Sequence, residues 1–226
     1  MYTPRHFDWN DLKQVGSFVD GAQAADLITF DGTRPVATLL PVIWDRPDDL
    51  GAGEPDAGEA GPGRYGRLLG HIAIANPQWQ TAAPGAQALA IVRGPQAYIS
   101  PAWYESKARH GRVVPTWNYE TVHLTGTVTF HQDAEWLRSL VTRLTERHEG
   151  GREHPWHVTD APPEYIDGQL RAIVGVELVV TSVEAKQKLS QNRSELDREG
   201  VVAGLRDESG PGRAQIADLM AAQLEG

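Results

Sequence analysis

The chain has 226 residues, of which 40% are hydrophobic, and it contains seven Trp. A disordered chain lacks the apolar surface that offsets the entropy of ordering, so this composition predicts one large folded domain, alone or with appendages. The 21 Lys and Arg stand against 30 Asp and Glu, giving a net charge of -9, and the cysteine count is zero. Direct nucleic-acid binding is therefore not expected, and disulfides, thiolate metal sites and cysteine nucleophiles are excluded.

The sequence shows no signal for membrane insertion or export. No stretch approaches the ~20 apolar residues that span a bilayer, and the first residues lack the apolar core of a signal peptide. We expect a soluble cytoplasmic protein without membrane association.

A helix and a hairpin are the first predicted elements. Asp8 is a candidate N-cap for a helix that ends near Gly21. Residues 26–44 form two apolar segments around Asp31-Gly32, which predicts two strands joined by a tight turn. Residues 45–66 then contain six Gly, three Pro, six acidic residues and two Arg. This composition predicts an exposed acidic insertion that contributes nothing to a core.

The middle of the chain predicts further strands. They cover residues 68–74, 88–93, 97–100 and 117–130, with a short helix or turn at 76–79 and a break at Gly94-Pro95. Apolar residues and threonines alternate most regularly in 117–130. Gly126 falls on the apolar face of that strand, which indicates a bulge or a close backbone approach.

The last third combines helices with one buried strand. Asp133 is expected to cap an amphipathic helix over 133–149, and a short helix is expected over 164–170. Residues 172–183 are apolar at both odd and even positions, which predicts a strand buried on both faces. The tail is helical, with Ile216, Leu219, Met220 and Leu224 in one stripe. About seven strands with mostly short links predict a β-rich α+β fold, a closed antiparallel barrel with peripheral helices. We expect a barrel domain over 1–185 and, over 186–226, a basic motif with a helical extension packed on the barrel.

Two sequence motifs are rejected. Residues 61–66 match G-x-G-x-x-G, but an acidic loop precedes the match and a strand follows it, whereas a dinucleotide site needs a strand before and a helix after. Histidines 148, 154 and 157 lie in a Pro- and Gly-rich loop without zinc-motif spacing, so no metal site is predicted.

Two side-chain clusters are candidates for ligand binding. The aromatic residues of the first suggest a rigid wall for a planar ligand or a dimer interface, with ordinary core packing as the alternative. They are Tyr98, Trp103, Tyr104, Trp117 and Tyr119. The second cluster, residues 186–193, combines two Lys and an Arg with a hydroxyl and amides, which suits a phosphate or another anion. Its alternative is a solvated helix start with Ser190 as the cap.

These clusters belong to a set of segments that occur in order along the chain. They are Met1-Tyr2 with Pro4 and Phe7, then residues 70–79 (GHIAIANPQW), 94–104 (GPQAYISPAWY), 114–119 (VPTWNY) and 188–193 (KLSQNR). Together they resemble the PaiB-like family, described as FMN-binding negative transcriptional regulators. The resemblance implies an FMN-binding split barrel, and a homodimer with the flavin at the subunit interface.

The resemblance also implies which residues lie near the cofactor. The cofactor-binding candidates are Thr38, His71, Asn76, Gln78, Trp117, Asn118, Lys188, Ser190 and Gln191. Tyr98, Trp103, Tyr104 and Tyr119 are the candidate substrate wall. His71 and His123 titrate near physiological pH and are weak catalytic candidates, the catalytic residues being otherwise unknown. The sequence departs from related split-barrel oxidases after the His71 strand, where a basic cluster is replaced by residues 75–78 (ANPQ).

Three functions remain open at this stage. The first is an FMN-dependent oxidoreductase acting on a small planar or apolar substrate. The second is a negative transcriptional regulator that acts through a partner or effector, because no helix-turn-helix, basic arm or zinc module is present. The third, by analogy with related split barrels, is a heme-binding or heme-degrading protein.

Overall fold

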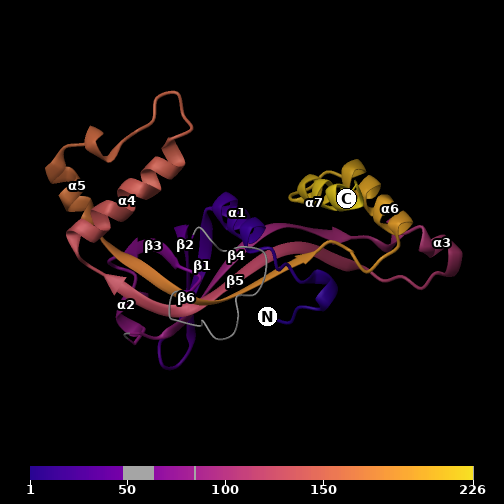
Figure 1. Cartoon of the computed structure of the whole chain (residues 1–226), viewed down its shortest axis with the longest axis horizontal. Helices are drawn as coiled ribbons and strands as arrows, with labels where there is room; N and C mark the ends of the chain where they lie inside the picture. Colours follow the sequence, from indigo (N-terminus) through magenta and orange to yellow (C-terminus); the bar gives the residue numbers. More distant parts are fainter. Residues whose placement is uncertain (48–63, 84, 226) are drawn as a thin grey trace. The chain divides into compact units, whose positions relative to one another are not determined.

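The computed structural model describes residues 1–47, 64–83 and 85–225. Most of the expected acidic insertion, 45–66, lies outside these residues. The described strands form a closed antiparallel barrel in the order β1-β2-β3-β6-β5-β4 (Figure 1). The strands are β1 (Ala24–Phe30), β2 (Pro35–Asp45), β3 (Arg67–Ala73), β4 (Gln87–Ile99), β5 (Thr116–His131) and β6 (Ile173–Lys188).

The expected number of about seven strands is too high by one for the described part of the chain. The difference arises in β4, which continues through Gly94 and Pro95 as one strand. The pairing of β4 with β1 ends at Ile91, so Pro95 lies beyond it, where a missing backbone donor is tolerated.

The chain divides into two compact units, which we call the barrel unit and the helical unit. The barrel unit comprises residues 11–92 and 123–183, and the helical unit comprises residues 1–10, 93–122 and 184–226. Strands β4, β5 and β6 contribute residues to both. The C-terminal segment thus belongs to the same unit as the N-terminus and the middle of the chain. The domain boundary expected at residue 185 stays a prediction.

The interior of the barrel unit is packed by aliphatic side chains. Residues that include Leu27, Leu40 and Leu178 line an apolar cavity of only about 10 Å³, which is roughly the room that one water molecule needs. Gly126 allows two strands to approach closely. A Cβ on Gly126 would lie 2.0 Å from the carbonyl oxygen of Val179, so the close approach expected at Gly126 is confirmed. The apolar cavity is therefore too small for a ligand larger than a water molecule.

The helices of the barrel unit are α1 (Leu12–Ala22), α2 (Gln78–Thr81), α4 (Ala134–Glu149), the 3₁₀ helix η3 (Val158–Asp160) and α5 (Pro163–Leu170). Asp133 caps α4 as expected, through its side chain and the Trp136 amide. The expected cap of α1 is wrong by three residues. Asp11 accepts from the amides of Lys13 and Gln14, whereas Asp8 pairs with Lys186 in an isolated β-bridge.

The hairpin between β1 and β2 has the expected turn. The Oδ1 atom of Asp31 accepts hydrogen bonds from the amides of Thr33 and Arg34. Gly32 has a φ of +94°, a conformation that is free of strain only for glycine. The local sequence therefore sets the register of these two strands.

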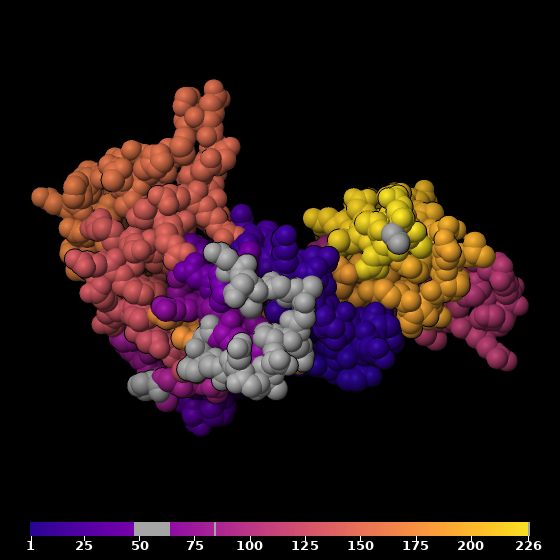
Figure 2. Space-filling model, viewed as in Figure 1, coloured from indigo at the N-terminus to yellow at the C-terminus, as the bar shows by residue number. Residues whose placement is uncertain are grey.

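The helical unit is built on a second core. Its helices are the 3₁₀ helices η1 (Arg5–Phe7) and η2 (Pro101–Trp103), with α3 (Ser106–His110), α6 (Glu195–Asp207) and α7 (Arg213–Glu225). Figure 2 shows α6 and α7 as one block of atoms, coloured orange to yellow. Buried residues of both helices, including Leu205, Ile216 and Met220, pack with Ile99 of β4 and with Leu189, which directly follows β6. None of the described helices combines the length and apolar character needed to cross a membrane.

The start of α6 differs from the expectation. Ser194 caps the helix by accepting from the Asp197 amide. Ser190, expected as a possible cap, instead has a φ of +62° in the turn after β6. The turn reverses the chain, so Ser190 ends the strand and does not begin the helix.

Candidate functional site

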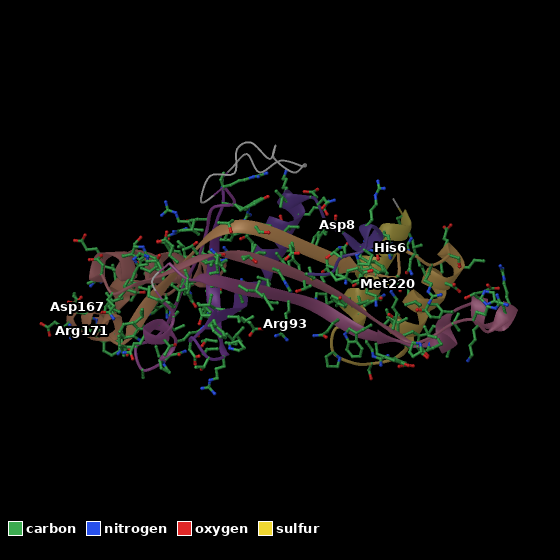
Figure 3. The ribbon with its side chains drawn as sticks, turned by 90° about the horizontal axis from the view of Figure 1, so that it is seen from below. His6, Asp8, Arg93, Asp167, Arg171 and Met220 are labelled. Carbon is green, nitrogen blue, oxygen red and sulfur yellow. The ribbon has the colours of Figure 1, made fainter. Side chains whose placement is uncertain are left out.

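The sheet of the helical unit has two different faces. Successive side chains of a strand point to opposite faces, and β5 shows this between residues 117 and 120. Asn118 and Glu120 are buried, whereas Trp117 is exposed and Tyr119 is half-buried. On the first face, which we call the covered face, Asn118 contacts Met220 of α7. Met220 is labelled in Figure 3. The second face is the one that carries Trp117 and Tyr119.

The covered face contains three residues expected near a cofactor. Asn118 Nδ2 donates to Ser190 Oγ over 3.0 Å and to Met220 Sδ over 3.4 Å. Gln191 accepts from the Leu189 amide and donates to the Gln187 carbonyl, at 2.7 and 2.6 Å. These contacts hold the turn between β6 and α6. Asn118, Ser190 and Gln191 thus use polar atoms to bind one another and the backbone.

The second face combines exposed aromatic rings with cationic side chains. Tyr98 is 42% exposed and Trp117 46% exposed, and their ring centroids lie 6.3 Å apart in an edge-to-face pair. The Trp117 indole donates to Gln96 Oε1 over 3.0 Å. Lys188 Nζ donates to the Trp117 carbonyl oxygen over 2.8 Å and to Thr116 Oγ1 over 2.5 Å. The structure therefore brings together two of the expected regions, the aromatic cluster and the basic motif.

Two members of the expected substrate wall lie away from this face. Tyr104 is 2% exposed and belongs to the core beneath α6 and α7. Trp103 packs on α6, where a Cβ on Gly204 would lie 2.4 Å from the indole Cγ. Both rings are thus occupied by contacts with the helices, while Tyr98, Trp117 and Tyr119 belong to strands.

In the barrel unit, three expected cofactor residues form a hydrogen-bonded network. Gln78 is fully buried, and its Nε2 lies within hydrogen-bond distance of the Leu27 carbonyl, Thr29 Oγ1 and the Val36 carbonyl, at 3.1 to 3.2 Å. Gln78 Oε1 accepts from Thr38, which in turn accepts from Asn76. The network links α2 to β1 and β2. Its polar atoms are bonded within the protein, which gives these residues a role in holding the hairpin.

The two catalytic candidates are histidines of the barrel unit. His71 lies on β3 and is half-buried, and this burial lowers the pKa of its imidazole. His71 is therefore mostly neutral at physiological pH and can accept a proton. His123 is half-buried on β5. Within residues 1–47, 64–83 and 85–225, no group of three or more His, Asp, Glu or Cys lies together as metal ligands would.

A comparison with protein families identifies the relationship of the chain. Residues 1–182 match the family described as "Putative FMN-binding domain". The chain belongs to this family. Membership agrees with the expected cofactor, FMN, and with the PaiB-like resemblance. It also agrees with the split-barrel fold expected from the motifs.

Relatives and solved structures support the same assignment. The chain is 32% identical to "Protease synthase and sporulation protein PAI 2" of Bacillus subtilis, over 100% of this chain and 99% of that protein. It is similar in fold to an FAD- and heme-binding protein of Mycobacterium smegmatis, with a TM-score of 0.54 and 16% identity over 91% and 82% of the two chains. A flavocytochrome of Azotobacter vinelandii gives a TM-score of 0.53 with 13% identity, over 83% and 72%. The expected fold class, a split barrel with peripheral helices, is confirmed.

The Gln78 network predicts a stability effect. Replacing Gln78 with Ala leaves the Leu27 and Val36 carbonyls without their partner, so we expect a loss of about 3 kcal/mol in the free energy of unfolding. Urea denaturation of the variant measures this loss. The exposed Gln80 of the same helix provides the control, since Gln80→Ala should change stability by less than about 0.5 kcal/mol. If Gln78→Ala is as stable as the parent but no longer binds flavin, then Gln78 contacts the ligand and does not hold the hairpin.

Glu120 predicts a pH effect. Burial raises the pKa of this carboxyl, and the hydrogen bond from Gln187 opposes the rise. The folded state thus binds the proton more tightly, so stability rises as the pH falls through the folded pKa. Glu120→Gln should unfold at a higher temperature than the parent at pH 7 to 8, and the difference should shrink as the pH falls through the raised folded pKa and be lost below pH 4.5, the ordinary pKa. The exposed Glu199→Gln should show no such trend, and a constant difference for Glu120→Gln would contradict burial as the cause.

Proposed function

We propose that this protein is an FMN-dependent oxidoreductase that acts on a small planar or apolar substrate. The observation that carries the proposal is the second face of the helical unit, where the exposed rings of Tyr98 and Trp117 form an edge-to-face pair and Lys188 donates to the Trp117 carbonyl oxygen. FMN combines a planar ring system with an anionic phosphate, and this face offers a partner of matching chemistry to each part. The apolar cavity inside the barrel unit, at about 10 Å³, is too small for either.

Each residue of this face has a distinct role in the proposal. Trp117, Tyr98 and Tyr119 supply ring surface that holds a planar group and excludes water from it. Lys188 supplies a positive charge to the phosphate on a long stem. When bound, FMN supplies hydride or electron transfer. In the barrel unit, His71 stays a catalytic candidate by itself, because burial lowers the pKa of its imidazole.

The other expected cofactor residues act through the structure around them. Asn118, Ser190 and Gln191 fix the turn that follows Lys188. Thr38, Asn76 and Gln78 hold the first hairpin of the barrel unit to α2. We assign these residues positioning roles, with Lys188 and the three exposed or half-exposed rings as the direct contacts.

A homodimer is part of the proposal. The outward residues of β2 are Pro35, Ala37, Leu39 and Pro41, all exposed, and Leu39 is 68% exposed. A continuous apolar stripe on a strand indicates an interaction surface. A second copy of the chain is the occupant that we propose, because one aromatic face covers only one side of a planar ring.

The alternative is a negative regulator that acts through a partner or effector. The full-length identity of 32% to PAI 2 of Bacillus subtilis favours it, since the name of that protein ties it to protease synthesis and sporulation. The same face would then bind the effector. The net charge of -9 and the absence of cysteine from the sequence support indirect action and a cytoplasmic location.

Flavin binding tests the proposal directly. The purified protein should be yellow or become so with FMN, lose its colour with dithionite and recover it in air. Trp117→Ala should weaken FMN binding about tenfold, because ring stacking is lost. The exposed Trp156 provides the control, and Trp156→Ala should bind as the parent does. A protein that takes up no FMN refutes the oxidoreductase. Titration with hemin tests the heme alternative. If the flavin-loaded protein oxidises none of the substrates tested, the regulator is favoured.

The dimer is tested by charge substitution. Leu39→Glu introduces a carboxylate into the apolar stripe and should convert the protein to a monomer. Sedimentation or light scattering measures the mass. The control is Leu196→Glu on α6, because Leu196 is also exposed, at 48%. If the parent protein is a monomer, or if Leu39→Glu stays a dimer, the proposed surface is wrong.

A further inference from the structure

Lys186 and Lys188 lie on the same face of β6, because they are two positions apart in the strand. Lys186 is only 8% exposed. Its Nζ donates to the Tyr2 carbonyl oxygen over 3.1 Å and lies 5.4 Å from the centre of the Tyr119 ring. Lys188 Nζ lies 6.0 Å from the centre of the Phe7 ring. The lysine pair is thus surrounded by aromatic rings and backbone.

Neither ammonium has an acidic partner in the described part of the chain. Two neighbouring carboxylates have other surroundings. Glu184, close in sequence, forms an ion pair with the amine of Met1, and Asp8, on the segment that pairs with Lys186, is exposed. Glu120 lies on the opposite face and accepts from Gln187. A buried charge without a counter-ion is unfavourable, and in a protein with a net charge of -9 this pairing of two lysines is unexpected.

The hydrogen-bond capacity of the pair is incompletely used. Each ammonium has three donors. Lys186 uses one of them on Tyr2, and Lys188 uses two, on Thr116 and Trp117. Three donors and two positive charges therefore remain for a ligand. Burial, and then the charge of Lys186, lowers the pKa of Lys188, as expected where a compensating negative charge is missing.

We propose that Lys186 and Lys188, enclosed by Phe7 and Tyr119, form a binding site for an oxyanion, a phosphate or carboxylate group. The N-terminal segment completes the site, since Asp8 bridges to Lys186 and Trp9 donates to the Ala185 carbonyl. The anion has two possible sources. It is the phosphate of FMN, in which case the site rests on the proposed function, or it is the anionic group of a separate substrate or effector.

The test measures the binding of three probes to the full chain by calorimetry: FMN, riboflavin and inorganic phosphate. Lys186→Gln and Lys188→Gln each remove one charge, and Lys107→Gln removes an exposed lysine of the same unit as a control. Each site variant should lose about 10- to 100-fold in affinity for the anion that occupies the site. Lys107→Gln should bind as the parent does.

The pattern of losses identifies the source of the anion. If the variants lose FMN affinity and keep that for riboflavin, the site holds the flavin phosphate. If FMN binding is unchanged and inorganic phosphate no longer binds to the flavin-loaded variants, the site holds a separate anion. If the parent binds no flavin, the proposed function fails, but a loss of phosphate binding in the variants still supports the site.

The opposite result is equally clear. Variants that bind FMN and phosphate as tightly as the parent overturn the proposal. Thermal unfolding checks that each variant is folded. Should Lys186→Gln fail to fold, Lys188→Gln and Lys188→Arg decide the matter, because Lys188 is less buried than Lys186. Arginine keeps the charge, so Lys188→Arg should retain more affinity than Lys188→Gln.

Discussion

The alternation of side chains along β5 and β6 is the constraint on which the helical unit depends. One face of these strands must supply a core for α6 and α7, and Asn118, Leu189 and Ser190 are committed to it. The residues that precede Asn118 and Leu189 then point to the other face. Trp117 and Lys188 are therefore displayed because their neighbours are buried, so the strands that support the core also carry the residues that we propose bind a ligand.

The sequence predicted those elements whose signals are local. The hairpin turn follows from Asp31 and Gly32, and α4 follows from its cap and apolar stripe. Errors occurred where a distant contact overrides a local signal. Gly94-Pro95 predicts a break, yet β4 continues because its partner strand has already ended. Asp8 is a good cap, but it pairs with Lys186 from the far end of the chain.

The candidate site was predicted in composition but not in geometry. Motifs such as residues 114–119 and 188–193 are contiguous in sequence, and each therefore predicts a single patch near the cofactor. In a strand, a contiguous motif is divided between two faces, so Trp117 and Asn118 have different surroundings. The two-residue period of a strand predicts this division of Trp117 and Asn118 between two faces. The position of Phe7 beside Lys188 had no local signal, because 181 residues separate them in the chain.

Hydrogen-bond satisfaction distinguishes two groups of polar side chains in this protein. Gln78, Thr38 and Asn76 are bonded to one another and to the backbone, so a ligand would have to break contacts in order to bind them. The lysine pair has unused hydrogen-bond donors and uncompensated charge, and binding an anion would reduce the free-energy cost of burying that charge in the folded protein. A buried group that lacks its counter-charge is a stronger indication of a ligand than a polar group that matches a motif. By this criterion, the second face of the helical unit, with its lysine pair, is the site that we propose for a ligand, and the bonded network of the barrel unit is structural.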